Sequence, residues 1–251
     1  MGRFSGTAVL VTGGSTGIGF AAADKFGKEG ARVAITGRDP DRLRAAASRL
    51  ASGTVAIQSD SADVNATRLL GDTVGRQFGK LDAVFINAGI VRLATIEAVS
   101  EELIDEVFSV NVKGAIFTIQ ALLPFLQPGS SVIVNTSVNN RIGMAGTLVY
   151  AASKAALRSV VRVAAGELAE RGIRVNAVSP GPVDTPIYDT LGLSAEALQA
   201  FAASIVPKIP LGRFAKAEEI AQVVLFLASA DSSFITGAEI VADGGWTGVT
   251  R

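Results

Sequence analysis

The segment VYAASKAAL, residues 149–157, holds a tyrosine and a lysine whose spacing could support acid–base chemistry. Tyr150 and Lys154 are four residues apart, so on a helix their side chains would share one face. A free phenol has a pKa of about 10, and a fixed cation nearby favours the phenolate. We therefore expect Lys154 to lower the pKa of Tyr150, making it a proton donor or acceptor near neutrality. Taken alone, the nonapeptide also fits a half-buried tyrosine beside a lysine that extends its charge to solvent.

The residue types missing from the chain exclude several other chemistries. The 251 residues include no histidine and no cysteine. This excludes Ser-His-Asp hydrolysis, thiolate nucleophiles, disulfides and zinc sites built from these ligands, and we expect no metal. The 23 basic residues balance 23 acidic ones, so nothing implies a general attraction to nucleic acid or anionic membrane. We expect a small-molecule substrate and no nucleic-acid partner.

The start of the chain and its apolar stretches indicate where the protein works. The N-terminal residues lack the charged start, apolar stretch and small-residue cleavage site of a signal peptide. Apolar stretches such as 114–126 fall short of the roughly 18 residues of a membrane span. We expect a cytoplasmic protein that does not associate with membranes.

Short apolar runs rich in valine and isoleucine alternate with helical patterns along the whole chain. This alternation predicts an α/β fold with a doubly wound parallel sheet and helices on both faces. Seven buried strands are expected at 7–11, 32–36, 54–58, 81–86, 131–136, 173–178 and 238–242. Helices are expected at about 17–29, 41–51, 63–78, 100–126, 149–171 and 217–228.

One long segment, 179–214, interrupts the alternation and contains five prolines and many apolar residues. An insertion at the carboxyl edge of a parallel sheet typically forms a substrate wall or lid. We expect a single domain, 1–251, with a substrate-binding lid at about 183–214. A surface subdomain that packs for stability alone is the alternative.

A glycine-rich turn follows the first predicted strand. Glycines there allow a tight turn and let a pyrophosphate approach amides at a helix N-terminus, which indicates a nucleotide site. The spacing from the strand end fits TGxxxGxG over Thr12–Gly19 and not the GxGxxA fingerprint, which would begin directly after the strand. Glycines alone could also serve only to close the turn.

With these motifs in order, the sequence resembles the short-chain dehydrogenase/reductase family along nearly its whole length. The resemblance implies a Rossmann-type fold and an NAD(P)-dependent oxidoreductase. It rests on the glycine turn Thr12–Gly19, the NAG motif at Asn87, Ala88 and Gly89, Asn111, Ser137 with the YxxxK pair Tyr150 and Lys154, the segment Ser179–Thr185, and DGGW from Asp243.

The resemblance assigns roles to individual residues. Ser137, at a predicted strand end, would polarise the substrate oxygen; Tyr150 would transfer the proton; Lys154 would also bind the nicotinamide ribose; and Asn111 would bend its helix and hold a water that relays protons to Lys154. An asparagine satisfied by backbone groups is the alternative for Asn111. The expected cofactor-binding set is Gly13, Ser15, Thr16, Gly17, Ile18, Gly19, Arg38, Asp60, Ser61, Asn87, Ala88, Gly89, Tyr150, Lys154, Pro180, Gly181, Val183 and Thr185.

Two of these assignments are more specific than the rest. Val183 and Thr185 would hold the nicotinamide carboxamide, again by resemblance. Asp60 would accept a hydrogen bond from the adenine amino group, although an aspartate after a strand is also an ordinary cap for the next helix.

The substrate remains open at this point. Candidate pocket residues are Asn139, Arg141, Met144, Tyr188 and Leu191, with Ile90 and Val91 beside them. The leading function is the interconversion of a carbonyl and a secondary alcohol. The alternatives are an NAD-dependent alcohol or sugar dehydrogenase, a 3-oxoacyl thioester reductase, a cofactor-free lyase or dehalogenase, and a non-catalytic nucleotide-binding protein. Apolar residues on more than one face of the helices 100–126 and 149–171 indicate a homotetramer, or at least a dimer.

The end of the second predicted strand favours NADP(H) over NAD(H). NAD-selective enzymes typically carry an acidic residue there, whereas an arginine accommodates the 2′-phosphate of NADP. This chain has Gly37 followed by Arg38, with Arg42 close by. Against this, Asp39 and Asp41 weaken the local field, and Thr16 stands where many NADP-selective relatives have a second basic residue.

Overall fold

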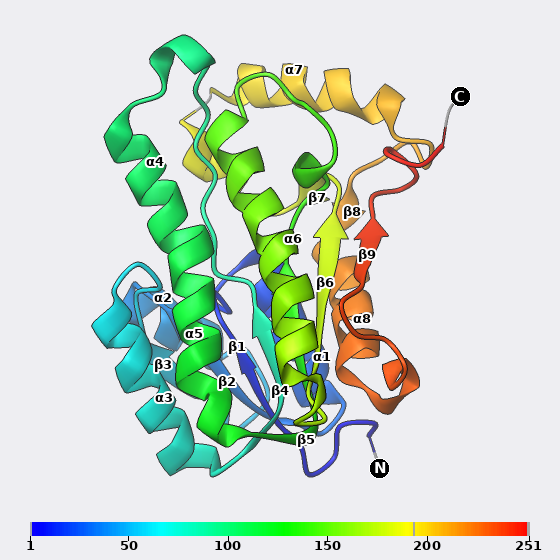
Figure 1. Ribbon diagram of the computed structural model, residues 1–251. Helices are drawn as coiled ribbons and strands as arrows, with labels where there is room; N and C mark the ends of the chain where they lie inside the picture. The colour runs from blue at the N-terminus through cyan, green and yellow to red at the C-terminus, as the bar shows by residue number, and fades with distance from the viewer. Residues whose placement is uncertain (1, 193, 250–251) are drawn as a thin grey trace.

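The computed structural model describes residues 2–192 and 194–249 and is built around a seven-stranded sheet (Figure 1). The strand order is β3-β2-β1-β4-β5-β6-β9, and every neighbouring pair is parallel. This is the doubly wound, Rossmann-type sheet that the alternation predicts. The strands are β1 (Ala8–Val11), β2 (Arg32–Gly37), β3 (Val55–Gln58), β4 (Leu81–Ile86), β5 (Leu126–Asn135), β6 (Arg174–Pro180) and β9 (Glu239–Ala242).

Helices cover both faces of this sheet because each strand is apolar on both sides. Val9 and Val11 of β1 pack into one hydrophobic core, and Ala8 and Leu10, pointing the opposite way, pack into the other. The first core is completed by α1 (Gly17–Lys28), α2 (Pro40–Ala47) and α8 (Ala217–Ala228). The second is completed by α3 (Val64–Phe78), α5 (Gly114–Leu122) and α6 (Leu148–Ala169).

The helix expected at 100–126 is a composite. It consists of α4 (Glu101–Phe108), a π-helical turn (Ser109–Lys113) and α5, followed by a 3-10 turn ending at Phe125. By length and composition alone this 25-residue stretch could cross a membrane, with a mean hydropathy of 1.3. In the structure it packs on α3 and α6, and 44% of its most apolar window is buried. Helices that cover a sheet meet the same criterion.

Two element boundaries differ from the sequence expectation for identifiable reasons. β5 begins at Leu126 and not at 131, because Leu126 pairs with Leu81 of β4 before a register shift. Ser130 stabilises this irregular start by accepting from the amide of Gln127 at 2.9 Å and donating to the carbonyl of Leu81 at 2.7 Å. The second helix ends at Ala47, four residues before the expected 51.

The lid, residues 183–214, extends above the carboxyl edge of the sheet (Figure 1). It begins with β7 (Val183–Asp184), continues through a 3-10 turn (Tyr188–Leu191), and then forms α7 (Ala195–Ile205). β7 pairs with β8 (Ala215–Lys216), which directly follows the lid. Position 193 lies outside the described residues.

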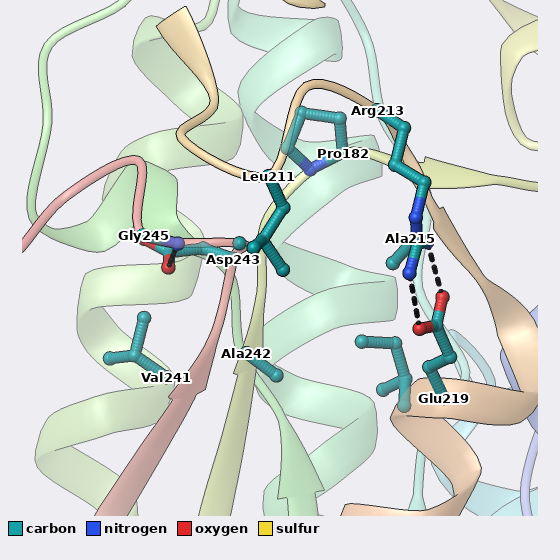
Figure 2. Close-up of a pocket in the computed structure, with 11 residues that line it drawn as sticks. Pro182, Leu211, Arg213, Ala215, Glu219, Val241, Ala242, Asp243 and Gly245 are labelled. Atoms are coloured by element: carbon teal, nitrogen blue, oxygen red, sulfur yellow. Dashed lines mark hydrogen bonds and ion pairs between the residues drawn. The ribbon is translucent and has the colours of Figure 1, made fainter.

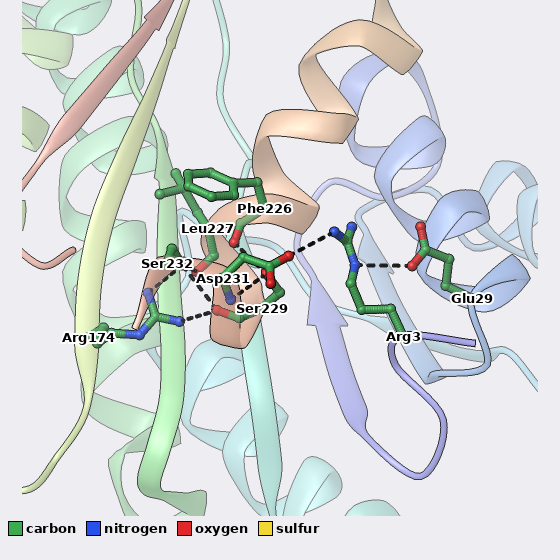
Figure 3. A network of polar contacts seen from close by, with 8 residues as sticks. All are labelled: Arg3, Glu29, Arg174, Phe226, Leu227, Ser229, Asp231 and Ser232. Carbon is green, nitrogen blue, oxygen red and sulfur yellow. Dashed lines mark hydrogen bonds and ion pairs between the residues drawn. The ribbon is translucent and has the colours of Figure 1, made fainter. Parts of the chain in front are cut away.

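A polar network holds the opposite, amino-terminal end of the sheet together (Figure 3). The Arg174 guanidinium on β6 donates to Ser232 Oγ at 2.9 Å and to the carbonyl of Ser229 at 3.1 Å, just past the end of α8. Arg3 bridges Glu29 and Asp231 at 3.2 and 3.4 Å. The network ties α8 to β6 and to the N-terminal segment, away from the carboxyl edge.

Candidate active site

The turn Thr12–Gly19 connects β1 to α1 and depends on its glycines. Gly13 and Gly17 have φ angles of 62° and 56°, in the left-handed region that favours glycine. A Cβ on Gly19 would lie 2.3 Å from the carbonyl oxygen of Gly13, so only a glycine fits there. The side chain of Thr16, at the N-cap of α1, makes no capping bond. The first amides of α1 are thus left for an anionic ligand.

The NAG segment after β4 fixes the other side of this turn. Thr12 Oγ1 accepts from the amides of Asn87 and Ala88 at 2.9 and 3.0 Å. The Asn87 side chain donates to the carbonyls of Thr12 and Gly13, both at 3.1 Å, and accepts from Asn135 Nδ2 at 2.9 Å. Asn87 therefore connects the glycine turn to the ends of β4 and β5.

A cavity of about 330 Å³ runs from the glycine turn to Tyr150 and Lys154. Fourteen of the predicted cofactor-binding residues line it: Gly13, Ser15, Thr16, Gly17, Ile18, Arg38, Asp60, Ser61, Asn87, Ala88, Gly89, Tyr150, Lys154 and Thr185. Gly19 supports the turn without lining the cavity, and Pro180, Gly181 and Val183 lie at the end of β6 and the start of β7. The residues that meet in this cavity are able to hold a dinucleotide. The first amides of α1 can bind a pyrophosphate, and Asp60, which follows β3, offers a side-chain carboxylate.

Asp60 has a local role in addition to its place in the cavity wall. Its Oδ1 accepts from the amide of Ala62 at 2.9 Å. The N-cap of α3 is Asp63 and not Asp60. The helix-cap alternative for Asp60 is thus wrong, and its contact with adenine stays a prediction.

Several cavity residues were not in the predicted cofactor set. They are Thr36, Gly37, Asp39, Arg42, Ser59, Ile90, Arg92, Val110, Asn135, Pro186, Ile187 and Thr190. Most of the missed residues at strand ends are sequence neighbours of a predicted residue, as Ser59 is of Asp60. Their position directly after a strand could have identified them, because ligands bind at the carboxyl ends of parallel strands. Val110 comes from the composite helix and Thr190 from the lid, and no periodicity in the sequence indicates that they reach the cavity.

Tyr150 and Lys154 lie one turn apart on α6, as their spacing predicts. Lys154 Nζ lies 5.7 Å from the centre of the Tyr150 ring and donates to the carbonyl of Asn135 at 2.8 Å. The lysine is 3% exposed, although it lines the cavity. The bond to the end of β5 holds this ammonium at the boundary between protein interior and cavity.

The electrostatics of the pair differ from the expectation. Burial raises the pKa of Tyr150, and the hydrogen bond with Ser137 acts in the opposite, weaker sense. Burial also lowers the pKa of Lys154 to about 8. The expected lowering of the Tyr150 pKa by the lysine is therefore wrong, because desolvation by burial is the largest influence on the phenol and raises its pKa. Tyr150 is thus a protonated donor at neutral pH.

Ser137 follows β5 and begins a 3-10 turn (Val138–Asn140). Its Oγ accepts from the amide of Asn139 at 3.2 Å, and its hydrogen bond with Tyr150 is one of the causes that set the pKa of the phenol. The serine is 8% exposed. A hydroxyl held in this way next to the phenol is suited to orient a substrate oxygen against Tyr150.

Asn111 lies at the centre of the π-helical turn and is fully buried. Its Oδ1 accepts from the amide of Ile90 at 2.8 Å, while its Nδ2 donates to the carbonyl of Ile90 and to Ser153 Oγ, both at 3.0 Å. The helix is irregular at this residue, as π-bulges at functional sites often are. These contacts agree with the alternative given for Asn111, an asparagine whose side chain is hydrogen-bonded within the protein. The proton-relay role of Asn111 stays a prediction.

Comparison with known proteins agrees with this geometry. Residues 13–247 match the family model described as enoyl-(acyl carrier protein) reductase. The oxidoreductase asL5 of Sarocladium schorii is 40% identical over 97% of this chain and 96% of the relative. The 3-oxoacyl-[acyl-carrier-protein] reductase FabG of Thermotoga maritima is 38% identical over 97% and 98%. A short-chain dehydrogenase/reductase structure from Mycobacterium marinum superimposes with a TM-score of 0.90 at 34% identity, covering 98% of both chains.

The chain belongs to the short-chain dehydrogenase/reductase family. It is thus an oxidoreductase that acts on carbonyl or alcohol groups of small molecules with a nicotinamide cofactor, NAD or NADP.

Lys154 of this dehydrogenase/reductase gives a pH-dependent stability that can be measured. The folded chain releases the lysine proton at about pH 8, whereas the unfolded chain keeps it to about 10.5. Between these values the unfolded state binds more protons, so wild-type stability rises with pH. Relative to Lys154→Met, the free energy of unfolding should gain about 3 kcal/mol across this window.

Urea unfolding at a series of pH values measures this gain. The control is Lys113→Met, which removes an exposed lysine in place of the buried one. A constant difference between wild type and Lys154→Met from pH 8 to 10.5 would show that the buried lysine keeps its ordinary pKa.

Of the predicted substrate-pocket residues, Ile90 lines the dehydrogenase/reductase cavity, whereas Asn139, Arg141, Met144, Tyr188, Leu191 and Val91 are not among its lining residues. Arg141 is paired with Glu239 at 2.8 Å. The Tyr188 ring packs between Phe201 and Phe214, with centroids at 6.0 and 5.9 Å, and burial raises its pKa to about 12. From the lid, Ile187 and Thr190 reach the cavity where Tyr188 and Leu191 were expected. Asn139 and Met144 belong to the loop after β5, and the roles of all seven stay predictions.

A second cavity of about 270 Å³ lies between the end of β9, the end of the lid and the start of α8 (Figure 2). Arg213 and Glu219 form a two-bonded ion pair at its rim, at 2.7 and 2.8 Å, and the hydrogen bond from Arg213 lowers the pKa of Glu219 to about 2. Tyr150 and Lys154 line the first cavity and not this one, whereas Ser137 lines neither. The oxidoreductase chemistry therefore belongs to the cavity that Tyr150 and Lys154 line.

Proposed function

We propose that this dehydrogenase/reductase is an NADP(H)-dependent enzyme that interconverts a carbonyl and a secondary alcohol. The observation that carries the proposal is the cavity that runs from the glycine turn to Tyr150 and Lys154, with Ser137 close enough to the phenol to influence its pKa. A bound nicotinamide cofactor supplies or accepts the hydride.

The protein groups handle the oxygen and its proton. In the reductive direction Ser137 donates a hydrogen bond to the carbonyl oxygen, and Tyr150 gives that oxygen its phenolic proton. Lys154, held by the carbonyl of Asn135, binds the ribose and stabilises the phenolate that is left. Asn111 fixes Gly89–Ile90 beside them through its two bonds to Ile90.

The intact catalytic set supports an enzyme over a non-catalytic nucleotide-binding protein, since a binding protein needs no phenol paired with a serine and a buried lysine. The intact glycine turn supports a cofactor-dependent enzyme over a cofactor-free lyase or dehalogenase. Among substrates, 3-oxoacyl thioesters remain a second candidate, because a relative covering nearly the whole chain is named as a reductase of these compounds. We propose a cytoplasmic location.

The choice of NADP(H) rests on two arginines. Arg38 and Arg42 line the cavity at the end of β2, and Gly37 offers no acidic side chain there. Of the two aspartates that could weaken this field, Asp41 pairs with Arg44, whereas Asp39 lines the cavity and keeps its charge while accepting from the amides of Asp41 and Arg42. Arginine can bind a phosphate through two parallel hydrogen bonds.

Substitution of Gly37 and Arg38 tests the proposed preference for NADP(H). The double variant Gly37→Asp/Arg38→Leu should move the ratio of kcat/KM for NADP over NAD toward NAD by at least about tenfold, or about 1.4 kcal/mol. A Cβ at position 37 would lie 3.3 Å from Leu43 Cδ1 and 3.5 Å from Ser15 Oγ, both side-chain atoms, so a small movement of the Leu43 side chain admits the aspartate without displacing backbone. A wild type that already prefers NAD, or a variant with unchanged preference, contradicts the NADP assignment.

We propose that the chain assembles as a homotetramer, or at least a dimer. Ile104 on α4, Ile116 on α5 and Val163 on α6 are 42%, 41% and 57% exposed, on neighbouring helices that cover one face of the sheet (Figure 1). Exposed apolar side chains grouped on packed helices are typical of an interface. Light scattering at micromolar concentration should show a mass of two or four chains; a clean monomer contradicts the proposal.

A further inference from the structure

Glu239, the first residue of β9, carries a buried carboxylate that the proposed chemistry does not use. β9 is the edge strand beside β6 (Figure 1), yet the Glu239 side chain is only 5% exposed. Burying a carboxylate costs free energy unless it is paired and hydrogen-bonded. The residues that pair with it are therefore informative.

Two of its partners flank Ser137. Glu239 Oε1 accepts from Thr136 Oγ1 at 2.8 Å and from Asn140 Nδ2 at 2.5 Å. Thr136 directly precedes the serine and Asn140 ends the 3-10 turn that the serine begins. One oxygen atom therefore holds both ends of the segment 136–140.

The other oxygen holds two arginines. Glu239 Oε2 lies 2.8 Å from Arg141 Nη2 and 3.2 Å from Arg158 Nε. Arg158 belongs to α6, one turn beyond Lys154. The carboxylate thus joins the segment that carries Ser137 to the helix that carries Tyr150 and Lys154.

We propose that Glu239 is a positioning residue that fixes the hydroxyl of Ser137 relative to the phenol of Tyr150. The inference rests on the proposed function, which gives both groups their roles. Glu239 touches neither substrate nor cofactor and acts only through the two segments that it joins.

The bonds of the segment show why loss of the carboxylate would release it. Thr136 also lies within 3.0 Å of the carbonyl of Val178, so the strand end keeps a partner without Glu239. Among the described residues, the Asn140 side chain has no such second contact: its Oδ1 is buried without a hydrogen-bond partner, and its Nδ2 would lose the acceptor it has. The turn after Ser137 would therefore shift to satisfy this amide. A displacement of about 1 Å in a positioned group can cost on the order of a hundredfold in rate.

The first readout needs no substrate. The chain has only two tyrosines, so ring-labelled protein gives two Cζ resonances, and Tyr150→Phe assigns them. In the holo form with NADP at neutral pH, Ser137→Ala should move the Tyr150 resonance by removing its hydrogen bond. Glu239→Ala should move the same resonance in the same direction, and the double variant should move it no further than Ser137→Ala alone.

The second readout is kinetic, with any carbonyl compound that the wild-type chain reduces. Glu239→Ala should lower kcat at least tenfold, with the Kd for NADP within threefold of wild type. Glu239→Gln keeps an acceptor for Thr136 and Asn140 and should retain more activity; it also replaces Glu239→Ala in the comparison if that variant does not fold. In the Ser137→Ala background either substitution should change kcat by less than threefold. Glu29→Ala, which removes the partner of Arg3 at the far end of the sheet, serves as the control and should leave kcat unchanged.

The outcomes separate this inference from the function it rests on. If Ser137→Ala lowers kcat but Glu239→Ala lowers it by the same factor with and without Ser137, Glu239 acts independently of the serine and only the inference is overturned. An unmoved Tyr150 resonance together with kcat within threefold in Glu239→Ala also overturns it. If Ser137→Ala itself changes neither the resonance nor kcat, the role proposed for Ser137 fails, and the inference fails with it.

Discussion

Tyr150→Phe should lower kcat by about a thousandfold, while the Kd for NADP(H) stays within about threefold of wild type. The substitution removes only the phenolic oxygen, and the ring keeps its packing beside Lys154, whose Nζ lies 5.7 Å from the ring centre. Burial keeps the phenol protonated, and no histidine or cysteine is present in the chain to replace it as a donor.

Two measurements made together give the test its control. Steady-state kinetics with a reducible carbonyl compound give kcat, and isothermal titration gives the Kd for the cofactor. Activity within about tenfold of wild type, or about 1.4 kcal/mol of barrier, would show that Tyr150 is not the proton donor. Loss of cofactor affinity along with activity would indicate a collapsed site and not a missing proton.

Gly19→Ala should weaken cofactor binding by about a hundredfold. The new Cβ would lie 2.3 Å from the carbonyl oxygen of Gly13 and 2.5 Å from Asn87 Nδ2. Gly13 belongs to the turn and Asn87 holds the turn from the end of β4, so the clash can be relieved only if the first turn of α1 moves away from the ends of β1 and β4, at a cost of about 1–3 kcal/mol. The amides expected to bind the pyrophosphate move with it.

Gly143→Ala is the matched control, because a Cβ added to Gly143 would meet no atom within 4 Å and this residue lacks a positive φ. Cofactor titration should give a Kd close to wild type for this variant. A Gly19→Ala protein that binds NADP within threefold of wild type would show that the first turn of α1 does not contribute to the nucleotide site.

The strands of the main sheet could be predicted because they are buried on both faces. Runs such as 7–11 and 81–86 are therefore almost wholly apolar, and the helices between them are regular in period. β7 and β8 could not be found in this way. Each is two residues long, and the remaining residues of the lid separate the two strands in the sequence. Neither strand therefore gives a local sequence pattern.

The site could be predicted as far as it depends on contiguous motifs. The glycine turn, the NAG segment and the pair Tyr150 and Lys154 meet at one cavity because each follows a strand or begins a helix at the same edge. The sequence gives no signal for Glu239, because its partners come from two segments, 136–141 and α6, that only the fold brings next to β9.

The direction predicted for the Tyr150 pKa from sequence spacing was wrong, because burial decides that direction. Spacing alone places an ammonium one turn from a phenol and indicates attraction between them. The structure buries Lys154 and half-buries Tyr150, so desolvation raises the pKa of Tyr150 and lowers that of Lys154 to about 8. Solvent exposure cannot be read from a four-residue spacing, and it reverses the sign of the effect on the phenol.

The measurement that tests the central claim most directly is oxidation of NADPH by wild-type protein with a panel of ketones, aldehydes, keto sugars and 3-oxoacyl thioesters, followed by the absorbance of the reduced nicotinamide. The account predicts that at least one carbonyl compound is reduced, that NADPH serves at least about tenfold better than NADH, and that Tyr150→Phe abolishes the signal. If NADPH binds in a parallel titration but no member of the panel is reduced and no alcohol is oxidised with NADP, the chain is a nucleotide-binding protein and the proposed enzyme mechanism is contradicted.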